Sequence, residues 1–228
     1  MEFEVLPVTR LKQNCSLLWC EATRRAAVID PGGDLDRILD FIDLLEIEVE
    51  VVLITHGHFD HCGGAARLAK LTGARIEGPH RGDAHLLAGL EAAGERYGVP
   101  ASTFEPARWL DHGDVVRFGK EMLEVLHCPG HCRGHVAYFS PAARQAFVGD
   151  ILFRGTIGAW QHGDGNLPRL IDSIRHRLFP LGDDIAFVPG HGPASSFGEE
   201  RRDNPFVSDA AFARWSARFT CAGDPAAA

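Results

Sequence analysis

The sequence predicts an α/β fold in which two mixed sheets pack face to face and helices cover their outer sides, a four-layer αββα sandwich. Three observations support this prediction. Apolar, β-branched segments alternate with segments of helical periodicity in both halves of the chain. In each half, histidine or aspartate follows directly after such a strand. The chain has 228 residues, 45% of them hydrophobic, which is enough to fill the core of one large domain.

The N-terminal half begins with strands and then alternates helices with strands. We expect strands at 3–8, 16–21, 26–30, 49–54 and 74–77, with a turn at 22–25 between the second and the third. A helix follows Asp34, whose carboxylate is expected to cap it, and its apolar stripe runs from Leu35 to Leu45. A second helix opens at Gly63–Gly64 and ends at Gly73, and residues 81–96 are expected to be helical.

The C-terminal half is richer in strands. We expect strands at 115–118, 121–127, 135–140, 145–149 and 184–188. Residues 151–166 are rich in glycine and expected to be irregular, after which Asn166 can cap a helix. A short helix is expected at 208–219 and a frayed tail at 222–228. Because no repeat or linker interrupts the pattern, residues 1–228 are expected to form a single domain.

Composition narrows the classes of partner. The formal net charge of −8 argues against a nucleic-acid-binding face and against an anionic membrane surface. The first residues lack the basic start and apolar run of a signal peptide, and no apolar stretch approaches the length of a membrane span. The six cysteines are therefore expected to be reduced, in the cytoplasm.

The densest chemistry lies at residues 55–61, Thr-His-Gly-His-Phe-Asp-His, directly after the apolar strand. It offers three imidazoles and one carboxylate, on His56, His58, Asp60 and His61. Three more residues of the same kind follow later strands: His131, Asp150 and His191. Neutral imidazole and carboxylate are the ligands of a borderline divalent cation such as zinc. The sequence therefore predicts a metal site with seven ligands at the strand ends.

The seven residues divide into two sets. Alternate residues of a loop that turns over a strand end can face opposite sides, so His56 and His58 can share one cation while Asp60 and His61 bind a second. A carboxylate can bridge two cations, which makes Asp150 the candidate bridge. His131 and His191 would then complete one site each. A position left open for water indicates a catalytic rather than a structural site.

Other residues near these motifs can be interpreted in two ways, as functional residues or as packing residues. Cys62, Cys128 and Cys132 adjoin the histidines and could be thiolate ligands or redox sensors. We favour packing, because the histidine and aspartate set is sufficient and no Cys-x-x-Cys pair exists. His127 and His135 lie on strands beside the site, and ordinary packing is again favoured over support of the ligands.

In their order and spacing, these ligands resemble those of the metallo-β-lactamase superfamily. Within it, the chain looks like the short type II glyoxalases, which lack a large helical C-terminal domain. The local motifs that carry this resemblance are Cys128-Pro129-Gly130-His131, Gly134-His135-Val136, Gly149-Asp150, Pro189-Gly190-His191-Gly192-Pro193 and residues 198–205, Gly-Glu-Glu-Arg-Arg-Asp-Asn-Pro.

The resemblance implies a hydrolase of thioesters that resembles hydroxyacylglutathione hydrolase and uses a hydroxide bridging two divalent metal ions. It implies one metal at His56, His58 and His131 and the other at Asp60, His61 and His191, bridged by Asp150. Asp60 would also orient the hydroxide. Zinc is the expected metal, and iron or manganese would also fit. The expected substrate is a small-molecule thioester, with glutathione as a candidate thiol carrier.

One segment departs from the family pattern. Type II glyoxalases usually carry Gly-Arg-x-Asp shortly after the bridging aspartate, whereas residues 158–164 read Gly-Ala-Trp-Gln-His-Gly-Asp. The arginine is absent, and Trp160 and His162 stand nearby at the expected mouth of the pocket. We therefore expect Trp160 and His162 to line the substrate pocket and to alter substrate choice.

Two other functions on the same fold stay open from the sequence. An iron-dependent persulfide dioxygenase would use one iron at His56, His131 and Asp150, and the ligand set alone does not distinguish it. A hydrolase of another ester or a lactone is the second. A lactamase is disfavoured by the absent secretion signal, and a nuclease by the acidic charge.

Overall fold

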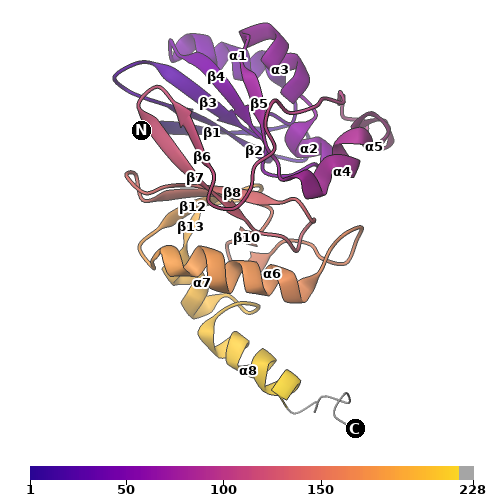
Figure 1. Cartoon of the computed structure of the whole chain (residues 1–228), viewed down its shortest axis with the longest axis vertical. Helices are drawn as coiled ribbons and strands as arrows, with labels where there is room; N and C mark the ends of the chain where they lie inside the picture. The colour runs from indigo at the N-terminus through magenta and orange to yellow at the C-terminus, as the bar shows by residue number, and fades with distance from the viewer. Residues whose placement is uncertain (221–228) are drawn as a thin grey trace.

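The computed structural model describes residues 1–220 and shows two sheets face to face between outer helices (Figure 1). The predicted four-layer α/β sandwich is confirmed. Three apolar clusters fill it: one between the first sheet and its helices, one between the two sheets, and one between the second sheet and its helices. The expected tail at 222–228 lies outside the described residues.

The first sheet has the strand order β1-β2-β3-β4-β5. Its strands are β1 (Glu2–Val8), β2 (Gln13–Trp19), β3 (Arg25–Ile29), β4 (Glu48–Leu53) and β5 (Arg75–Glu77). The first three strands are antiparallel, and β3, β4 and β5 are parallel to one another. Parallel neighbours need a crossover, and the helices between them supply it on the outer face. All five predicted strands of this half are present, with ends shifted by a few residues.

The helices of this half are α1 (Leu35–Leu44), α2 (Phe59–Cys62), α3 (Ala65–Thr72), α4 (Ala84–Ala88) and α5 (Leu90–Tyr97). α1 buries the predicted stripe, but Asp34 does not cap it as expected. Asp34 has a left-handed backbone (φ 51°), and its Oδ2 accepts from the Thr9 backbone N–H at 2.7 Å. The helix expected at 81–96 is divided at Gly89, which ends α4 and precedes α5.

The second sheet has the order β13-β12-β9-β8-β7-β6. Its strands are β6 (Val115–Phe118), β7 (Glu121–His127), β8 (Val136–Ser140), β9 (Gln145–Gly149), β12 (Ala186–Pro189) and β13 (Ser195–Ser196). β12 runs parallel to β9, and α6 (Leu167–Ser173) crosses between them. Asn166 caps α6 as predicted, with its side chain accepting from the Arg169 backbone N–H.

Several elements of this half were not expected. The segment expected to be irregular contains a small hairpin of β10 (Leu152–Phe153) and β11 (Thr156–Ile157). β13 and α7 (Phe197–Asp203) were also missed. The predicted last helix is α8 (Asp209–Thr220), which extends away from the sandwich (Figure 1). None of the helices within residues 1–220 has both the length and the apolar character needed to cross a membrane.

The strand order positions the candidate ligands. β4, β9 and β12 end just before Thr55, Asp150 and Gly190, and β7 ends four residues before His131. β4 belongs to the first sheet and the other three to the second. The candidate ligands therefore come from both sheets.

Candidate metal centre

The structure brings all seven candidate ligands together. Among the seven candidate ligands, two sets of three have donor atoms within 4.8 Å of one another: His56, His58 and His131, called here the three-histidine group, and Asp60, His61 and His191, called the aspartate group. Both sets match the division expected from the sequence. The aspartate group draws on α2 and on the loop after β12, which lie 130 residues apart in sequence.

The three-histidine group converges on one point. His58 Nδ1 lies 3.0 Å from His56 Nε2 and 3.0 Å from His131 Nε2. His56 is fully buried and His131 is 8% exposed. Three ring nitrogens at such distances cannot all carry protons, so the arrangement suits a shared electron-pair acceptor.

Asp150 connects the two groups. Its Oδ1 lies 3.3 Å from His61 Nε2, and its Oδ2 lies 3.8 Å from His131 Nε2 and 3.9 Å from His191 Nε2. Asp60 Oδ2 lies 3.3 Å from His191 Nε2, within the aspartate group only. The carboxylate of Asp150 thus faces both groups, as expected of a bridge.

The outer nitrogens of the histidines are held by the protein. His131 Nδ1 lies 2.8 Å from the Ala159 carbonyl oxygen, and His191 Nδ1 lies 3.2 Å from that of Leu11. A donated proton at Nδ1 leaves Nε2 as the electron-pair donor. The Ala159 contact uses the backbone, so the departure from the family pattern at 158–164 leaves this support of His131 intact.

Asp30 is a functional residue that the sequence analysis missed. It is buried, its Oδ1 accepts from the Thr55 backbone N–H at 2.8 Å, and its Oδ2 lies 2.9 Å from His61 Nδ1. It therefore orients His61 and fixes the start of the ligand loop. Asp30 follows β3 directly. The pattern that predicted the ligands, a histidine or aspartate just after a strand, is therefore also present at Asp30.

The two groups differ in charge. Burial lowers the pKa of His58 to about 4, with the nearby His131 adding to the effect. Burial likewise lowers the pKa of His56 well below its usual range. The three-histidine group is therefore rich in neutral imidazole, the form that binds metal.

In the aspartate group, carboxylates reverse the effect of burial. Burial would lower the pKa of His61, but Asp150 and Asp60 raise it well above its usual value. Burial would raise the pKa of Asp150, but His61, followed by His131 and His191, holds it well below its usual value. Without metal, this group therefore holds paired imidazolium and carboxylate ions.

The donor atoms fit a divalent cation. His61 Nε2 and Asp150 Oδ1 are buried and have no hydrogen-bond partner within the part of the chain that the structure describes. The two atoms face each other at 3.3 Å as an ion pair without forming a hydrogen bond, so a cation between them would give each a ligand bond that the protein alone does not supply. Imidazole nitrogen and carboxylate oxygen are the donors that zinc, iron and manganese accept.

The neighbouring cysteines make hydrogen bonds. Cys62 Sγ donates to the His58 carbonyl oxygen at 3.1 Å, and Cys132 Sγ donates to Asp83 at 3.0 Å. Burial raises the pKa of Cys128 to about 12. Buried thiols that donate hydrogen bonds support the packing interpretation.

Trp160 and His162 lie on the loop that supports His131. Trp160 is half-buried and packs edge-on against Phe206, with ring centroids 5.8 Å apart. His162 is exposed. The role of both residues in a substrate pocket stays a prediction.

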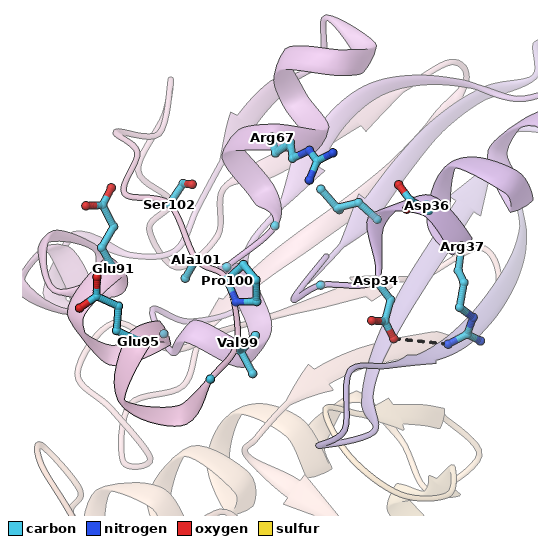
Figure 2. Close-up of a pocket in the computed structure, with 16 residues that line it drawn as sticks. Asp34, Asp36, Arg37, Arg67, Glu91, Glu95, Val99, Pro100, Ala101 and Ser102 are labelled. Atoms are coloured by element: carbon cyan, nitrogen blue, oxygen red, sulfur yellow. Dashed lines mark ion pairs between the residues drawn. The ribbon is translucent and has the colours of Figure 1, made fainter.

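A separate cavity of about 900 Å³ lies between the start of α1, the start of α3 and α5 with the segment that follows it (Figure 2). Leu35, Val99 and Pro100 give it apolar walls, and Asp34 and Arg37 form an ion pair of 3.6 Å at its rim. Its 16 lining residues include none of the seven candidate ligands, so it is distinct from the candidate metal centre.

Comparisons with known proteins agree with this geometry. A family model for the metallo-beta-lactamase superfamily matches residues 8–197. Hydroxyacylglutathione hydrolase GloC from Haemophilus influenzae is 40% identical over 210 residues, which cover 91% of this chain and 99% of that protein.

Two solved structures are similar along most of the chain. BLEG-1 B3 metallo-beta-lactamase has a TM-score of 0.83 and 28% identity, over 90% of this chain and 99% of that one. TTHA1623 in a di-iron-bound form has a TM-score of 0.81 and 32% identity, over 90% and 100%. The resemblance expected from the motifs, including that to the type II glyoxalases, is confirmed. The chain belongs to the metallo-β-lactamase superfamily.

Proposed function

We propose that this protein is a metal-dependent hydrolase of thioesters, similar to hydroxyacylglutathione hydrolase, that works with two divalent cations. The observation that carries the proposal is the position of Asp150, whose two oxygens face His61 on one side and His131 and His191 on the other. The similarity to the GloC hydrolase supports the substrate class.

We assign one cation to the three-histidine group and the other to the aspartate group, with Asp150 shared between them. Zinc suits the imidazole-rich donor set, and iron or manganese would suit it as well. The similarity to a protein that has been solved in a di-iron-bound form supports two ions per chain and keeps iron among the candidates.

Bound cations of this kind lower the pKa of water and polarise a carbonyl group. The chain itself supplies the orientation. The pKa of Asp60 lies below its usual value, because His61 and His191 outweigh the effect of burial, so the carboxylate is ionised and can accept a hydrogen bond from the attacking water. A thiolate is a good leaving group, so the reaction needs no separate strong acid.

We propose that Trp160 and His162 border the substrate. Trp160 would supply an apolar wall for the acyl-thiol portion of a small-molecule thioester, with glutathione as a candidate thiol carrier. We further propose that residues 1–228 form one domain.

We also propose a cytoplasmic location. The five described cysteines are free thiols, which supports a reducing environment.

Metal analysis together with two activity assays tests the proposal. Metal-replete protein should contain about two ions per chain and hydrolyse S-lactoylglutathione without oxygen. A single iron per chain, with oxygen uptake on glutathione persulfide and no thioester hydrolysis, would overturn it in favour of a persulfide dioxygenase.

A further inference from the structure

A second buried carboxylate, Asp83, lies behind the three-histidine group. It sits in the turn that leads into α4 and is fully buried. It belongs to neither group of candidate ligands. A carboxylate out of contact with water must be compensated by hydrogen bonds or by charge.

Asp83 is compensated by two loops that carry candidate ligands. Its Oδ2 accepts from the backbone N–H of Gly57 at 3.0 Å and from the thiol of Cys132 at 3.0 Å. Its Oδ1 accepts from the backbone N–H of Gly134 at 2.5 Å. Gly57 stands between His56 and His58, and Cys132 and Gly134 follow His131. One carboxylate therefore joins the two loops that form the three-histidine group.

The backbone around Asp83 fits this arrangement closely. The N–H of His80 donates to the carbonyl oxygen of Gly134 at 3.0 Å, so the turn and the second loop are connected in both directions. A Cβ at Gly134 would lie 2.5 Å from the Asp83 nitrogen, and one at Gly57 would lie 3.3 Å from the Asp83 Cβ. The two glycines let both loops approach the carboxylate.

We propose that Asp83 is a positioning residue that fixes the His56–His58 loop and the His131 loop relative to each other. The proposal rests on the proposed function, because the three-histidine group is taken there to hold a metal ion. None of the three donors to Asp83 is cationic. The three donors reach both oxygens of the carboxyl group, whereas an asparagine of the same shape offers only one acceptor oxygen and an NH₂ group with two N–H donors.

Asp83→Asn tests the proposal in the full-length protein. Glu77→Gln is the matched control, because Glu77 is also buried, precedes Asp83 by six residues and pairs with Arg75 and Arg108 instead of the ligand loops. Zinc affinity is measured by competition with a chromophoric chelator. Loss of such support typically weakens metal affinity about 10–100-fold. Asp83→Asn should lower the affinity for one of the two zinc ions by such a factor and leave the affinity for the other nearly unchanged.

Hydrogen exchange of the Gly57 and Gly134 amides in metal-free protein gives a readout that does not depend on metal. Both amides should be protected in the wild type although they lie in loops, and should exchange faster in Asp83→Asn. Glu77→Gln should change neither the zinc affinities nor the exchange of these two amides, whatever its effect on the melting temperature. The proposal is overturned if both amides are unprotected in the wild type. It is also overturned if Asp83→Asn leaves both zinc affinities unchanged, or if it lowers the affinity of both zinc sites by the same factor. A wild type that takes up neither zinc, iron nor manganese would instead overturn the proposed function, and the amides alone would then decide the role of Asp83.

Discussion

The backbone N–H of Asp150 donates a hydrogen bond to Nε2 of His135 at 3.0 Å. His135 Nδ1 donates in turn to the Val136 carbonyl oxygen, also at 3.0 Å. Burial, followed by the nearby His131, keeps the pKa of His135 well below its usual value, so its ring is neutral and can accept. His135 therefore positions Asp150 and also stacks on the ring of His56. The sequence had favoured packing as its only role.

His135→Phe keeps a ring in the core but removes the acceptor for the Asp150 N–H. An unsatisfied buried donor costs about 1–3 kcal/mol, so the free energy of unfolding in urea should fall by this amount. Metal content should also fall, because Asp150 loses its support. His176→Ala, an exposed histidine, is the control and should change neither. Unchanged metal content in His135→Phe would contradict the positioning role.

Asp150→Ala should lose more metal than Asp60→Ala. Asp150 faces both groups whereas Asp60 belongs to one, so elemental analysis should give near zero for the first variant and about one ion per chain for the second. Both variants should keep a cooperative thermal transition, since Asp60 in α2 and Asp150 after β9 lie outside the three apolar clusters. Equal losses, or full occupancy without Asp150, would refute the assignment of the bridge.

Gly190→Ala should disable the centre by steric conflict. The added Cβ would lie 2.1 Å from Asp150 Oδ1 and 2.6 Å from the His61 ring carbon Cε1. We expect loss of metal and of hydrolysis. Gly113→Ala is the control: it has φ 86° but no atom within 4 Å of the added Cβ, so it should cost about 1 kcal/mol of stability and leave the metal in place. Normal metal content in Gly190→Ala would contradict this prediction, because it would mean that the loop shifts to accommodate the added Cβ.

Metal uptake by metal-free protein at pH 7 should release protons. His61, whose pKa lies above the usual value, is protonated there and must lose a proton to bind. His58, with a pKa of about 4, is already neutral and releases none. As the pH falls toward 4, His58 takes up a proton in competition with metal, so affinity should decrease. Calorimetry in two buffers with different ionisation enthalpies measures the release, and identical heats in the two buffers would contradict it.

Trp160→Ala should raise KM for a thioester about five-fold with little change in kcat, the pattern expected when an apolar wall is lost. S-lactoylglutathione is compared with a truncated N-acetylcysteamine thioester. Both should be turned over, because the arginine of the family pattern is absent from 158–164. Thermal unfolding of the variant controls for the loss of the Phe206 contact. If truncation abolishes activity and Trp160→Ala has no effect, the substrate is recognised through another site.

The strand pattern of the sequence predicted the fold. It also predicted that the seven candidate ligands lie at strand ends, and the packing of the two sheets brings the ends of β4, β7, β9 and β12 together. The N-cap at Asn166 and the helix end at Gly73 were likewise local signals and were predicted correctly. β13 was missed because a two-residue strand is too short to show a period. α7 was missed although Ser196 caps it, with its side chain accepting from the Glu199 backbone N–H. The Asp34 cap was wrong because a tertiary contact with Thr9 outcompeted the local one.

The supporting residues were harder to predict than the ligands. Asp30 contacts a loop 25 residues away, and Asp83 joins one loop 26 residues before it to another 51 residues after it. Neither residue lies in a sequence motif that indicates which residues it contacts. Asp30 follows a strand, as the ligands do, but the groups that bind the carboxylates of Asp30 and Asp83 become apparent only once the fold brings them together.

The arrangement of donors across both sheets couples the fold to metal supply. His56, His58, Asp60 and His61 follow a strand of the first sheet, and His131, Asp150 and His191 follow strands of the second. An unfolded chain cannot offer this combination, so a bound cation stabilises only the native state. Each tenfold rise in free metal above the dissociation constant adds about 1.4 kcal/mol to the free energy of unfolding. A cell short of metal would therefore hold a protein that is both inactive and more readily degraded.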